Sequence, residues 1–275
     1  MSSKLENSLL GKIVKYKNDY DNGLLFRIPR IDKRKELGWG EKVPFYGLDI
    51  WNAYEVSWLN EQGKPLVYLV RMYVPANSEF IAESKSLKLY FNSLNNSRFS
   101  SISAVFDIIK KDLETLVNTS IELELIDVNS HKETIGNLSG ENIDSLDIKC
   151  LEYDTANPEL LEYENVIVTE EINSNLLKSN CLVTNQPDWG SVVIKYTGKK
   201  IQRESLLQYI VSFRNHNEFH EQCVERIFRD ISKLIDPTYL SVYASYTRRG
   251  GVDISPYRTT EKNFVYPKNI RLVRQ

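Results

Sequence analysis

Residues 179–191, S-N-C-L-V-T-N-Q-P-D-W-G-S, place the thiol of Cys181 seven residues before the carboxylate of Asp188. Cys181 stands at the polar start of a strand-like run, and the Pro-Asp-Trp-Gly around Asp188 predicts a tight turn. A thiol and a carboxylate held close together can act as a nucleophile with a proton donor. The same residues also fit a small buried cysteine and an aspartate that accepts a hydrogen bond within its own turn. The pair alone therefore leaves chemistry and packing both open.

A second group of reactive side chains begins the helix that we predict at residues 219–235. Glu221 either complements the helix dipole or, with His220, forms a hydrogen-bonding pair for a guanine-like ring edge. His216, His220 and Cys223 also follow the pattern H-x3-H-x2-C, which on a helix would bring two imidazoles to one face, as zinc sites do. However, the sequence holds no H-E-x-x-H or C-x-x-C companion, and Cys223 falls on the apolar stripe of the helix. We therefore predict no metal site.

Two further polar stretches have the composition of phosphate-binding segments. Residues 83–88, E-S-K-S-L-K, offer a carboxylate, two hydroxyls and two ammonium groups beside a helical region. Residues 248–251, R-R-G-G, offer cations next to glycines that permit close backbone approach. The first also fits a solvated connection, and the second fits a hairpin tip. Neither a Rossmann G-x-G-x-x-G after a strand nor a G-x-x-x-x-G-K-[ST] loop is present, so those nucleotide sites are not supported.

The composition indicates a globular protein without a membrane span. The chain has 275 residues, 41% hydrophobic and 26% charged, with a formal net charge of -2. That charge gives no general argument for nucleic acid or a membrane surface, and no run of about 18 apolar residues indicates a transmembrane helix. The polar N-terminus lacks the apolar segment of a secretory signal, and three cysteines fit a reducing compartment. We predict a cytoplasmic protein with no membrane and no direct nucleic-acid partner.

The elements that must position these side chains follow one order twice. Residues 1–43 are polar and turn-rich and predict an extended arm that becomes ordered only by docking. Period-two patterns and apolar stripes then predict strands and helices. The expected strands are 45–58, 66–74, 121–128, 165–170, 182–196, 240–246 and 252–254, and the expected helices are 100–118, 204–213 and 219–235. Residues 129–162 hold Gly136, Gly140 and Pro158 and form the best candidate linker. Strands in hairpin order around a helical pair favour an α+β fold with antiparallel sheets.

Four separated motifs resemble one known family, the nitrile reductase QueF, an NADPH-dependent 7-cyano-7-deazaguanine (preQ0) reductase. They are E-S-K-S-L-K at residues 83–88, N-Q-P-D-W-G-S with the preceding Cys181, H-E-Q-C-V-E-R-I-F at 220–228, and Y-T-R-R-G-G at 246–251. Since the lysine motif and the cysteine lie in different halves, the chain resembles the longer, two-module type. After the arm at 1–43, the resemblance implies two tandem tunnelling-fold (T-fold) modules, which we place at 44–150 and 151–275. Each would be an antiparallel sheet with paired helices, and the protein would be a homodimer.

The resemblance also implies an activity and roles for individual residues. The expected reaction is the reduction of the preQ0 nitrile to a primary amine with NADPH, in the queuosine pathway of tRNA modification. Cys181 would form a covalent thioimide and Asp188 would supply a proton. The ring would be held by Ala82, Glu83, Ser84, His220 and Glu221, and NADPH by Ser84, Lys85, Arg249 and Gly250. Two other interpretations stay open, namely a metal-dependent purine or pterin cyclohydrolase of the same superfamily and a non-catalytic nucleobase-binding scaffold.

Overall fold

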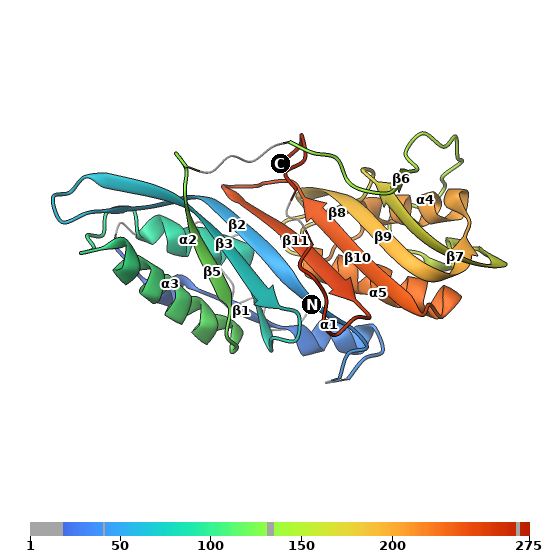
Figure 1. Cartoon of the computed structure of the whole chain (residues 1–275), viewed down its shortest axis with the longest axis horizontal. Helices are drawn as coiled ribbons and strands as arrows, with labels where there is room; N and C mark the ends of the chain where they lie inside the picture. Colours follow the sequence, from blue (N-terminus) through green and yellow to red (C-terminus); the bar gives the residue numbers. More distant parts are fainter. Residues whose placement is uncertain (1–18, 41, 131–134, 268–269) are drawn as a thin grey trace. The chain divides into compact units, whose positions relative to one another are not determined.

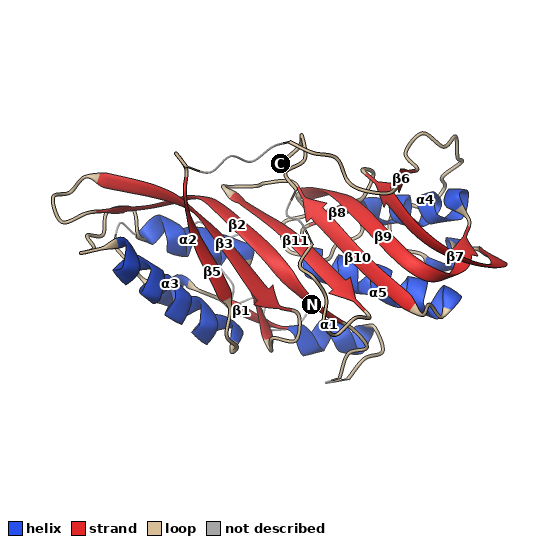
Figure 2. Ribbon diagram, in the orientation of Figure 1, coloured by secondary structure: helices blue, strands red, loops and turns tan. Residues whose placement is uncertain are grey.

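The computed structural model describes residues 19–40, 42–130, 135–267 and 270–275, which form an α+β protein with predominantly antiparallel strands, as predicted (Figures 1 and 2). Contacts divide these residues into two compact units. The first unit comprises 19–40, 49–130 and 248–253, and the second comprises 42–48, 135–247, 254–267 and 270–275. Because this division follows contacts and not chain order, the ranges 1–43, 44–150 and 151–275 stay a prediction. None of the described helices is long and apolar enough to cross a membrane.

The sheet of the first unit carries two helices. Its strands lie in the order β5 (Glu122–Asp127), β3 (Pro65–Pro75), β2 (Tyr46–Leu59), and β3 pairs antiparallel with β5. Helix α2 (Ser84–Ser93) and helix α3 (Ile102–Val117) cover it (Figure 2). Helix α3 begins where the Ser101 hydroxyl accepts from the Ala104 amide at 3.1 Å, and it ends at Asn118, whose φ is 55°. The local sequence thus determines this helix, although Ile102 at its first position is exposed.

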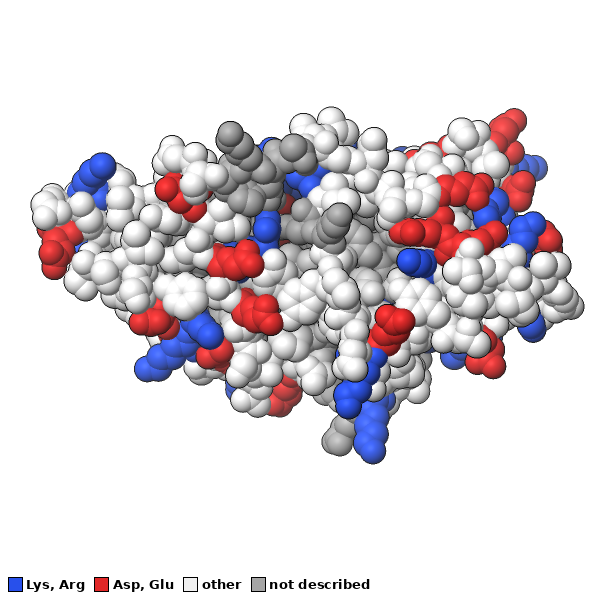
Figure 3. All heavy atoms as spheres, in the orientation of Figure 1, with Lys and Arg blue, Asp and Glu red and all other residues white. Residues whose placement is uncertain are grey.

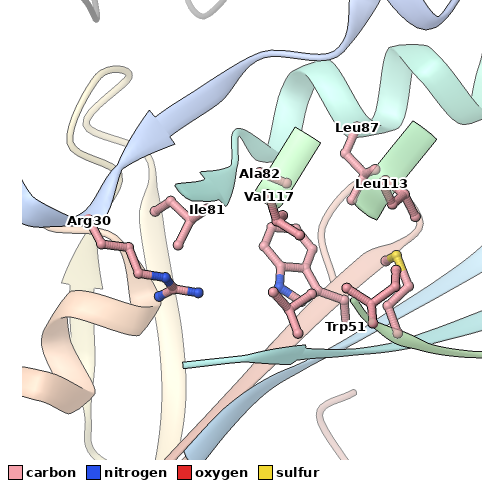
Figure 4. Close-up of a pocket in the computed structure, with 10 residues that line it drawn as sticks. Arg30, Trp51, Ile81, Ala82, Leu87, Leu113 and Val117 are labelled. Carbon is pink, nitrogen blue, oxygen red and sulfur yellow. The ribbon is translucent and has the colours of Figure 1, made fainter. Parts of the chain in front are cut away.

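The core of the first unit lies where these helices meet the sheet. Figure 4 shows Trp51 from β2 lining this region together with Leu87 of α2, Val117 of α3 and Arg30. The side chains enclose a void of about 10 Å³. That volume is at the lower limit for one water molecule, so this cavity is a packing feature and not a ligand site.

The N-terminal segment is folded where the structure describes it, so the prediction of an extended arm is wrong for residues 19–40. This segment contains β1 (Arg27–Pro29) and α1 (Arg30–Glu36), and β1 pairs antiparallel with β4 (Phe80–Ala82). Arg30 is buried and donates to Asp49 at 2.6 Å, and the Arg34 guanidinium donates to the carbonyl of Ala76. These long-range contacts are not visible in a polar, turn-rich sequence. Residues 1–18 lie outside the described residues.

The sheet of the second unit carries the other helical pair. Its strands lie in the order β11 (Val252–Thr259), β10 (Tyr239–Tyr246), β9 (Pro187–Ile201), β7 (Tyr163–Ser174), β6 (Glu141–Asn142), and β8 (Lys178–Asn180) pairs with one end of β9. Helices α4 (Arg203–Ser212) and α5 (His220–Ile235) pack on this sheet (Figure 1). The predicted stripe of α5 is confirmed, because Cys223, Val224 and Ile227 are completely buried.

Two sequence-based expectations for this unit are wrong. The segment expected as a linker contains β6, which pairs in parallel with β7, and it buries Ile143 and Leu161. The strand expected at 182–196 begins only at Pro187, since Leu182 to Thr184 form a turn.

Charged side chains of both signs are mixed on the visible surface (Figure 3). Arg203, for example, contacts Glu141 at 2.8 Å and Glu170 at 2.9 Å.

Candidate active site

Cys181 lies at the end of β8, in a hairpin with β9. The ladder pairs Ser179 with Asp188 and Asn180 with Pro187, and it continues as the Cys181 amide donates to the carbonyl of Gln186 at 2.9 Å. The chain reverses through residues 182–185, and Asn185 adopts the left-handed conformation with φ of 55°. The predicted Pro-Asp-Trp-Gly turn is therefore wrong, because these four residues are the first part of β9. Proline fits at the first residue of a strand, where its missing N–H is tolerated.

The pairing places Cys181 and Asp188 on the same face of the hairpin. Successive side chains of a strand alternate between faces, so Ser179 and Cys181 point the same way and Asp188 lies opposite Ser179. Burial follows this alternation, because Cys181 is 9% and Asp188 5% exposed, while Asn180 between Ser179 and Cys181 is less buried. Diagonal neighbours in an antiparallel pair lie about 7–8 Å apart at Cα, within reach of a bound small molecule.

The start of α5 brings His220 to Asp188. The His220 Nε2 atom lies 3.5 Å from Asp188 Oδ2, and the imidazole lies against the ring of Tyr246 with the centroids 3.9 Å apart. Tyr246 stands at the end of β10, opposite Gly190 in the ladder. A Cβ atom at Gly190 would lie 3.2 Å from the Tyr246 ring, so the glycine makes room for it. The sheet thus fixes the plane of the imidazole beside the carboxylate.

Two buried polar atoms around this hairpin lack a close hydrogen-bond partner among the described residues. They are Thr184 Oγ1 and His220 Nε2, whose contact with Asp188 is long at 3.5 Å. Each such group costs about 1–3 kcal/mol if it remains unsatisfied, and native interiors contain few of them. A polar ligand or a water molecule bound beside Asp188 would satisfy both of these atoms.

Glu221 and Cys223 follow His220 on α5 and are both buried. Glu221 is 3% exposed and lies in the first turn, where the helix dipole favours its carboxylate. Burial raises the pKa of the Cys223 thiol, as expected for a core cysteine. His216 precedes the helix and contacts Glu218 at 3.2 Å, so the rival interpretation with two imidazoles on one helical face does not hold. No group of three or more potential ligands for a metal is present in the described part of the chain.

Glu83 begins α2 in the first unit. It is fully buried, and its two carboxylate oxygens accept from the amides of Lys85 at 2.7 Å and Ser86 at 2.8 Å. Burial raises the pKa of Glu83, and these two hydrogen bonds oppose the rise. Glutamate is an unusual residue at the N-cap, where shorter side chains are preferred. The alternative of a solvated connection therefore does not hold for Glu83, although Ser84 and Lys85 are partly exposed.

A pocket in the first unit, here called the lysine pocket, joins α2 to the hairpin tip at residues 248–251. It has a volume of about 340 Å³ and is lined by Lys85, Lys88 and Glu55 together with Gly250 and Gly251. Gly250 has φ of 57° and Gly251 φ of 77°, and a Cβ atom at Gly251 would lie 2.8 Å from the Glu55 carboxylate. The positive φ at both positions favours glycine, and a side chain at Gly251 would also displace the Glu55 carboxylate.

Contacts within the first unit hold this hairpin tip. The Tyr54 amide donates to the Gly251 carbonyl at 2.9 Å, and the Arg248 guanidinium lies 4.6 Å from the centre of the Tyr54 ring. The Tyr54 hydroxyl in turn donates to Asp253 at 2.5 Å. Arg249 begins the tight turn, its amide donating to the Val252 carbonyl at 2.9 Å. The tip is thus a structured loop, which suits a site that depends on exact backbone position.

The structure places the predicted site residues in two groups. Cys181, Asp188, His220 and Glu221 belong to the second unit, and the first three lie around the hairpin just described. Ala82, Glu83, Ser84, Lys85, Arg249 and Gly250 belong to the first unit. Of these, Lys85 and Gly250 line the lysine pocket, whereas Ala82 borders the small apolar void at the end of β4. The assigned roles of all these residues stay predictions.

Comparison with known proteins identifies the family. Residues 16–125 match the model for the N-terminal part of nitrile reductase, 7-cyano-7-deazaguanine reductase, and residues 187–264 match that for QueF-like protein. The chain is 54% identical over 272 residues to the NADPH-dependent 7-cyano-7-deazaguanine reductase of Rickettsia bellii (strain OSU 85-389), covering 98% of this chain and 99% of that protein. The chain belongs to the family of NADPH-dependent 7-cyano-7-deazaguanine reductases. The reductase of Rickettsia typhi (strain ATCC VR-144 / Wilmington) is likewise 54% identical over 271 residues, with coverage of 98% and 99%.

A solved structure aligns less extensively with this member of the reductase family. It is the archaeosine synthase QueF-Like in the apo form, with 16% identity, 35% of this chain and 94% of that chain covered, and a TM-score of 0.30. Agreement at this level supports no structural argument, so the assignment to the reductase family depends on the sequence matches.

Sequence reasoning missed the roles of Glu218, Arg226 and Tyr246. They lie around the hairpin formed by β8, Cys181 and the start of β9, here called the thiol hairpin. Glu218 is 1% exposed and forms an ion pair with Arg226 of α5 at 2.6 Å. The Tyr246 ring packs against the imidazole of His220. The acidic Glu218 beside three aromatic or histidine residues offered a weak signal, because a charge in such surroundings needs a partner. The eight-residue spacing to Arg226 could not be interpreted before the start of α5 was known.

Proposed function

We propose that this chain reduces the nitrile of 7-cyano-7-deazaguanine to the aminomethyl group, giving 7-aminomethyl-7-deazaguanine for queuosine biosynthesis. The family membership supports the substrate and the reductant, since the relatives are NADPH-dependent 7-cyano-7-deazaguanine reductases. The observation that carries the proposal is the hairpin that presents Cys181 and Asp188 on one face beside His220 and unsatisfied polar groups. Nitrile to primary amine is a four-electron reduction, which requires two hydride equivalents and therefore two NADPH.

Cys181 is the nucleophile in this proposal. A nitrile carbon is electrophilic, and addition of the thiol across the C≡N bond gives a covalent thioimide. In this proposal the sulfur–carbon bond forms at Cys181 as its thiol proton passes to the Asp188 carboxylate, and Asp188 then delivers that proton to the nitrogen. Because both side chains are nearly buried, the adduct is sheltered from water that would hydrolyse it.

Ring recognition is assigned to His220 and Glu221. A carboxylate accepts two donors at once, so Glu221 matches the paired N–H groups of a guanine-like edge. The stack with Tyr246 and the contact with Asp188 hold the His220 imidazole in one plane. Ala82, Glu83 and Ser84 complete the predicted set, and Glu83 keeps acceptor capacity on both oxygens after capping α2.

The lysine pocket fits the phosphate-rich part of NADPH. It combines two lysine side chains with glycines at positive φ, where backbone can approach a phosphate closely. Lys85 and Gly250 line this pocket, and Ser84 and Arg249 are neighbours of those residues in the chain. When bound, NADPH supplies the hydride equivalents, and the residues named here bind and orient it.

We also infer a cytoplasmic homodimer with no direct nucleic-acid partner. The three free cysteines, of which Cys181 must remain a thiol for the proposed chemistry, fit a reducing compartment. The cyclohydrolase alternative required a metal held by His216 or Cys223, and the contacts of those residues do not favour it. The binding-scaffold alternative predicts ring binding without a covalent adduct, so one experiment separates it from the reductase.

The test is intact-mass measurement of the protein mixed with 7-cyano-7-deazaguanine in the absence of NADPH. We expect an added mass equal to the nitrile compound in the wild type and in a Cys150→Ser control, and none in Cys181→Ala. With NADPH present, two equivalents should be consumed per nitrile. Wild-type protein that binds the ring without adding its mass, or a Cys181→Ala variant that still turns over, would overturn the proposal.

A further inference from the structure

An ion pair next to the thiol hairpin links Cys181 to α5. Glu218 is 1% exposed, and Arg226 donates to both of its oxygens, from Nε at 2.9 Å and from Nη2 at 2.6 Å. His216 lies 3.2 Å from the same carboxylate. Burial alone would raise the pKa of Glu218, but the hydrogen bonds from Arg226 and His216 outweigh it and hold the pKa at about 2. The pair is therefore charged at every physiological pH.

The segment that carries Glu218 is joined to β8 through the backbone. The Asn180 amide donates to the His216 carbonyl at 2.8 Å, and the Glu218 amide donates to the Asn180 carbonyl at 3.1 Å. Asn217 forms a parallel bridge with Asn180, and its side-chain amide donates to the Cys181 carbonyl at 3.5 Å. The short strand β8 is thus held on one edge by β9 and on the other by residues 216–218.

We propose that Glu218 and Arg226 are positioning residues for Cys181. Arg226 lies in the second turn of the 16-residue helix α5, whose first turn carries His220 and Glu221. Through Glu218 the same helix fixes the backbone immediately before Cys181. The ion pair therefore sets the distance between the nucleophile and the residues proposed to hold the ring. This inference rests on the proposed role of Cys181 as the nucleophile.

A purely structural role would make a different prediction. If the pair only stabilised the second unit, its loss would open the core generally, and the fully buried Cys223 would become reactive together with Cys181. If the pair positions β8, its loss should affect Cys181 while Cys223 stays protected. Cys150, which is partly exposed, provides a reference thiol in the same molecule.

The experiment compares Glu218→Gln with wild type in two measurements on the full chain. Peptide mass spectrometry follows iodoacetamide labelling of each cysteine, and intact mass follows adduct formation with 7-cyano-7-deazaguanine. We expect Cys181 labelling to rise about threefold relative to Cys150, Cys223 to stay unlabelled, and adduct formation to slow about tenfold or more, since small misplacements of reacting groups have effects of this size. Arg226→Lys keeps one charged donor to Glu218. Its rate of adduct formation should therefore lie between those of Glu218→Gln and wild type.

The matched control is Glu225→Gln on the same helix. Glu225 is 2% exposed and is contacted by Arg258 at 2.9 Å, but this pair leads to the carbonyls of Leu48 and Tyr257 and not to β8. The control should leave both Cys181 measurements near wild type. If Glu218→Gln does not fold, the same two measurements on Arg226→Lys test the inference. Absence of iodoacetamide labelling at Cys223 then shows that this variant is folded.

Unchanged adduct formation in the folded variants, or labelling of Cys223 in step with Cys181, overturns the inference. A wild type that forms no adduct at all would instead refute the proposed function. The labelling ratios of Cys181 would then still decide whether the ion pair positions that residue.

Discussion

Replacing Glu218 by glutamine should change how the stability of the protein depends on pH. Glutamine keeps the shape and one acceptor oxygen for Arg226, but it cannot ionise. In the folded wild type the pKa of Glu218 is lowered from its ordinary value of 4.5 to about 2, burial being outweighed by hydrogen bonds from Arg226 and His216. A group whose pKa is lowered by folding contributes stability above its unfolded pKa and loses it as pH falls through the folded value. The contribution is thus complete at pH 7 and declines below about pH 4.5.

The magnitude follows from the same two pKa values. A tenfold difference in proton affinity between the folded and unfolded chain corresponds to about 1.4 kcal/mol, so the ionised Glu218 contributes about 3 kcal/mol to the free energy of unfolding at neutral pH. Integrating the linkage relation with those two values gives a loss of about 1.4 kcal/mol of this contribution by pH 3.5. All other carboxylates titrate in both proteins, so the difference between wild type and variant reports on Glu218 together with its contact to His216.

The assay is urea unfolding of both proteins at pH 7 and pH 3.5, followed by tryptophan fluorescence and far-UV circular dichroism. Coincident transitions from the two probes justify a two-state free energy. Wild type should be more stable than Glu218→Gln at pH 7, and the gap should narrow by about 1.4 kcal/mol at pH 3.5. A gap that is constant or wider at low pH would refute the assignment of a charged, strongly paired Glu218.

Three other predictions concern the pocket and the imidazole. Gly250→Ala should weaken NADPH binding about fivefold or more in a fluorescence titration, because φ of 57° and the Lys88 chain at 3.2 Å both disfavour a Cβ atom; unchanged affinity would contradict the pocket assignment. Tyr54→Phe should lower the free energy of unfolding by about 1–2 kcal/mol through loss of the bond to Asp253, measured by thermal unfolding. Tyr246→Leu should raise the KM for 7-cyano-7-deazaguanine about two- to tenfold, whereas Tyr246→Phe keeps the stack and should not.

The local sequence predicted elements that depend on local interactions. Helix α3 has its own cap at Ser101 and its own apolar stripe, and α5 has a stripe that includes Cys223 and Ile227, so both were found within a few residues of their bounds. The tip at 248–251 was also predicted correctly as a hairpin turn, because paired glycines are the usual signal for one.

Elements that depend on distant partners were predicted less well. The N-terminal segment is held in place by Arg30, whose hydrogen bonds are accepted by Asp49 and Ser78. Both partners are distant in the sequence, so the sequence around Arg30 does not indicate them. The turn after Cys181 has the apolar and β-branched sequence L-V-T, which resembles a strand, and only the left-handed Asn185 marks the reversal. Pro187 was interpreted as part of a turn although it begins β9, since a single sequence does not show which strand edge faces a partner.

The candidate site was predicted by resemblance for its reactive residues and missed for its supports. The proposed reactive residues Cys181, Asp188 and His220 occur in short motifs, so they could be named from the sequence. Their supports have no motif, because a support is defined by what it touches. Glu218 and Tyr246 could be identified only after the start of α5 and the register of β10 with β9 were known.

The common element behind these supports is α5. Its first turn carries His220 and Glu221, and its second turn carries Arg226. Arg226 holds Glu218 and through it β8, the strand that ends immediately before Cys181. A rigid helix of 16 residues therefore positions both the proposed ring contacts and the nucleophile. If that is correct, loosening Arg226 should lower the rate of adduct formation more than the affinity for the ring, since His220 and Glu221 remain in place. Substituting Glu221 should instead lower the affinity for the ring more than the rate of adduct formation. Measuring rate and affinity for both variants distinguishes positioning of the thiol from recognition of the ring.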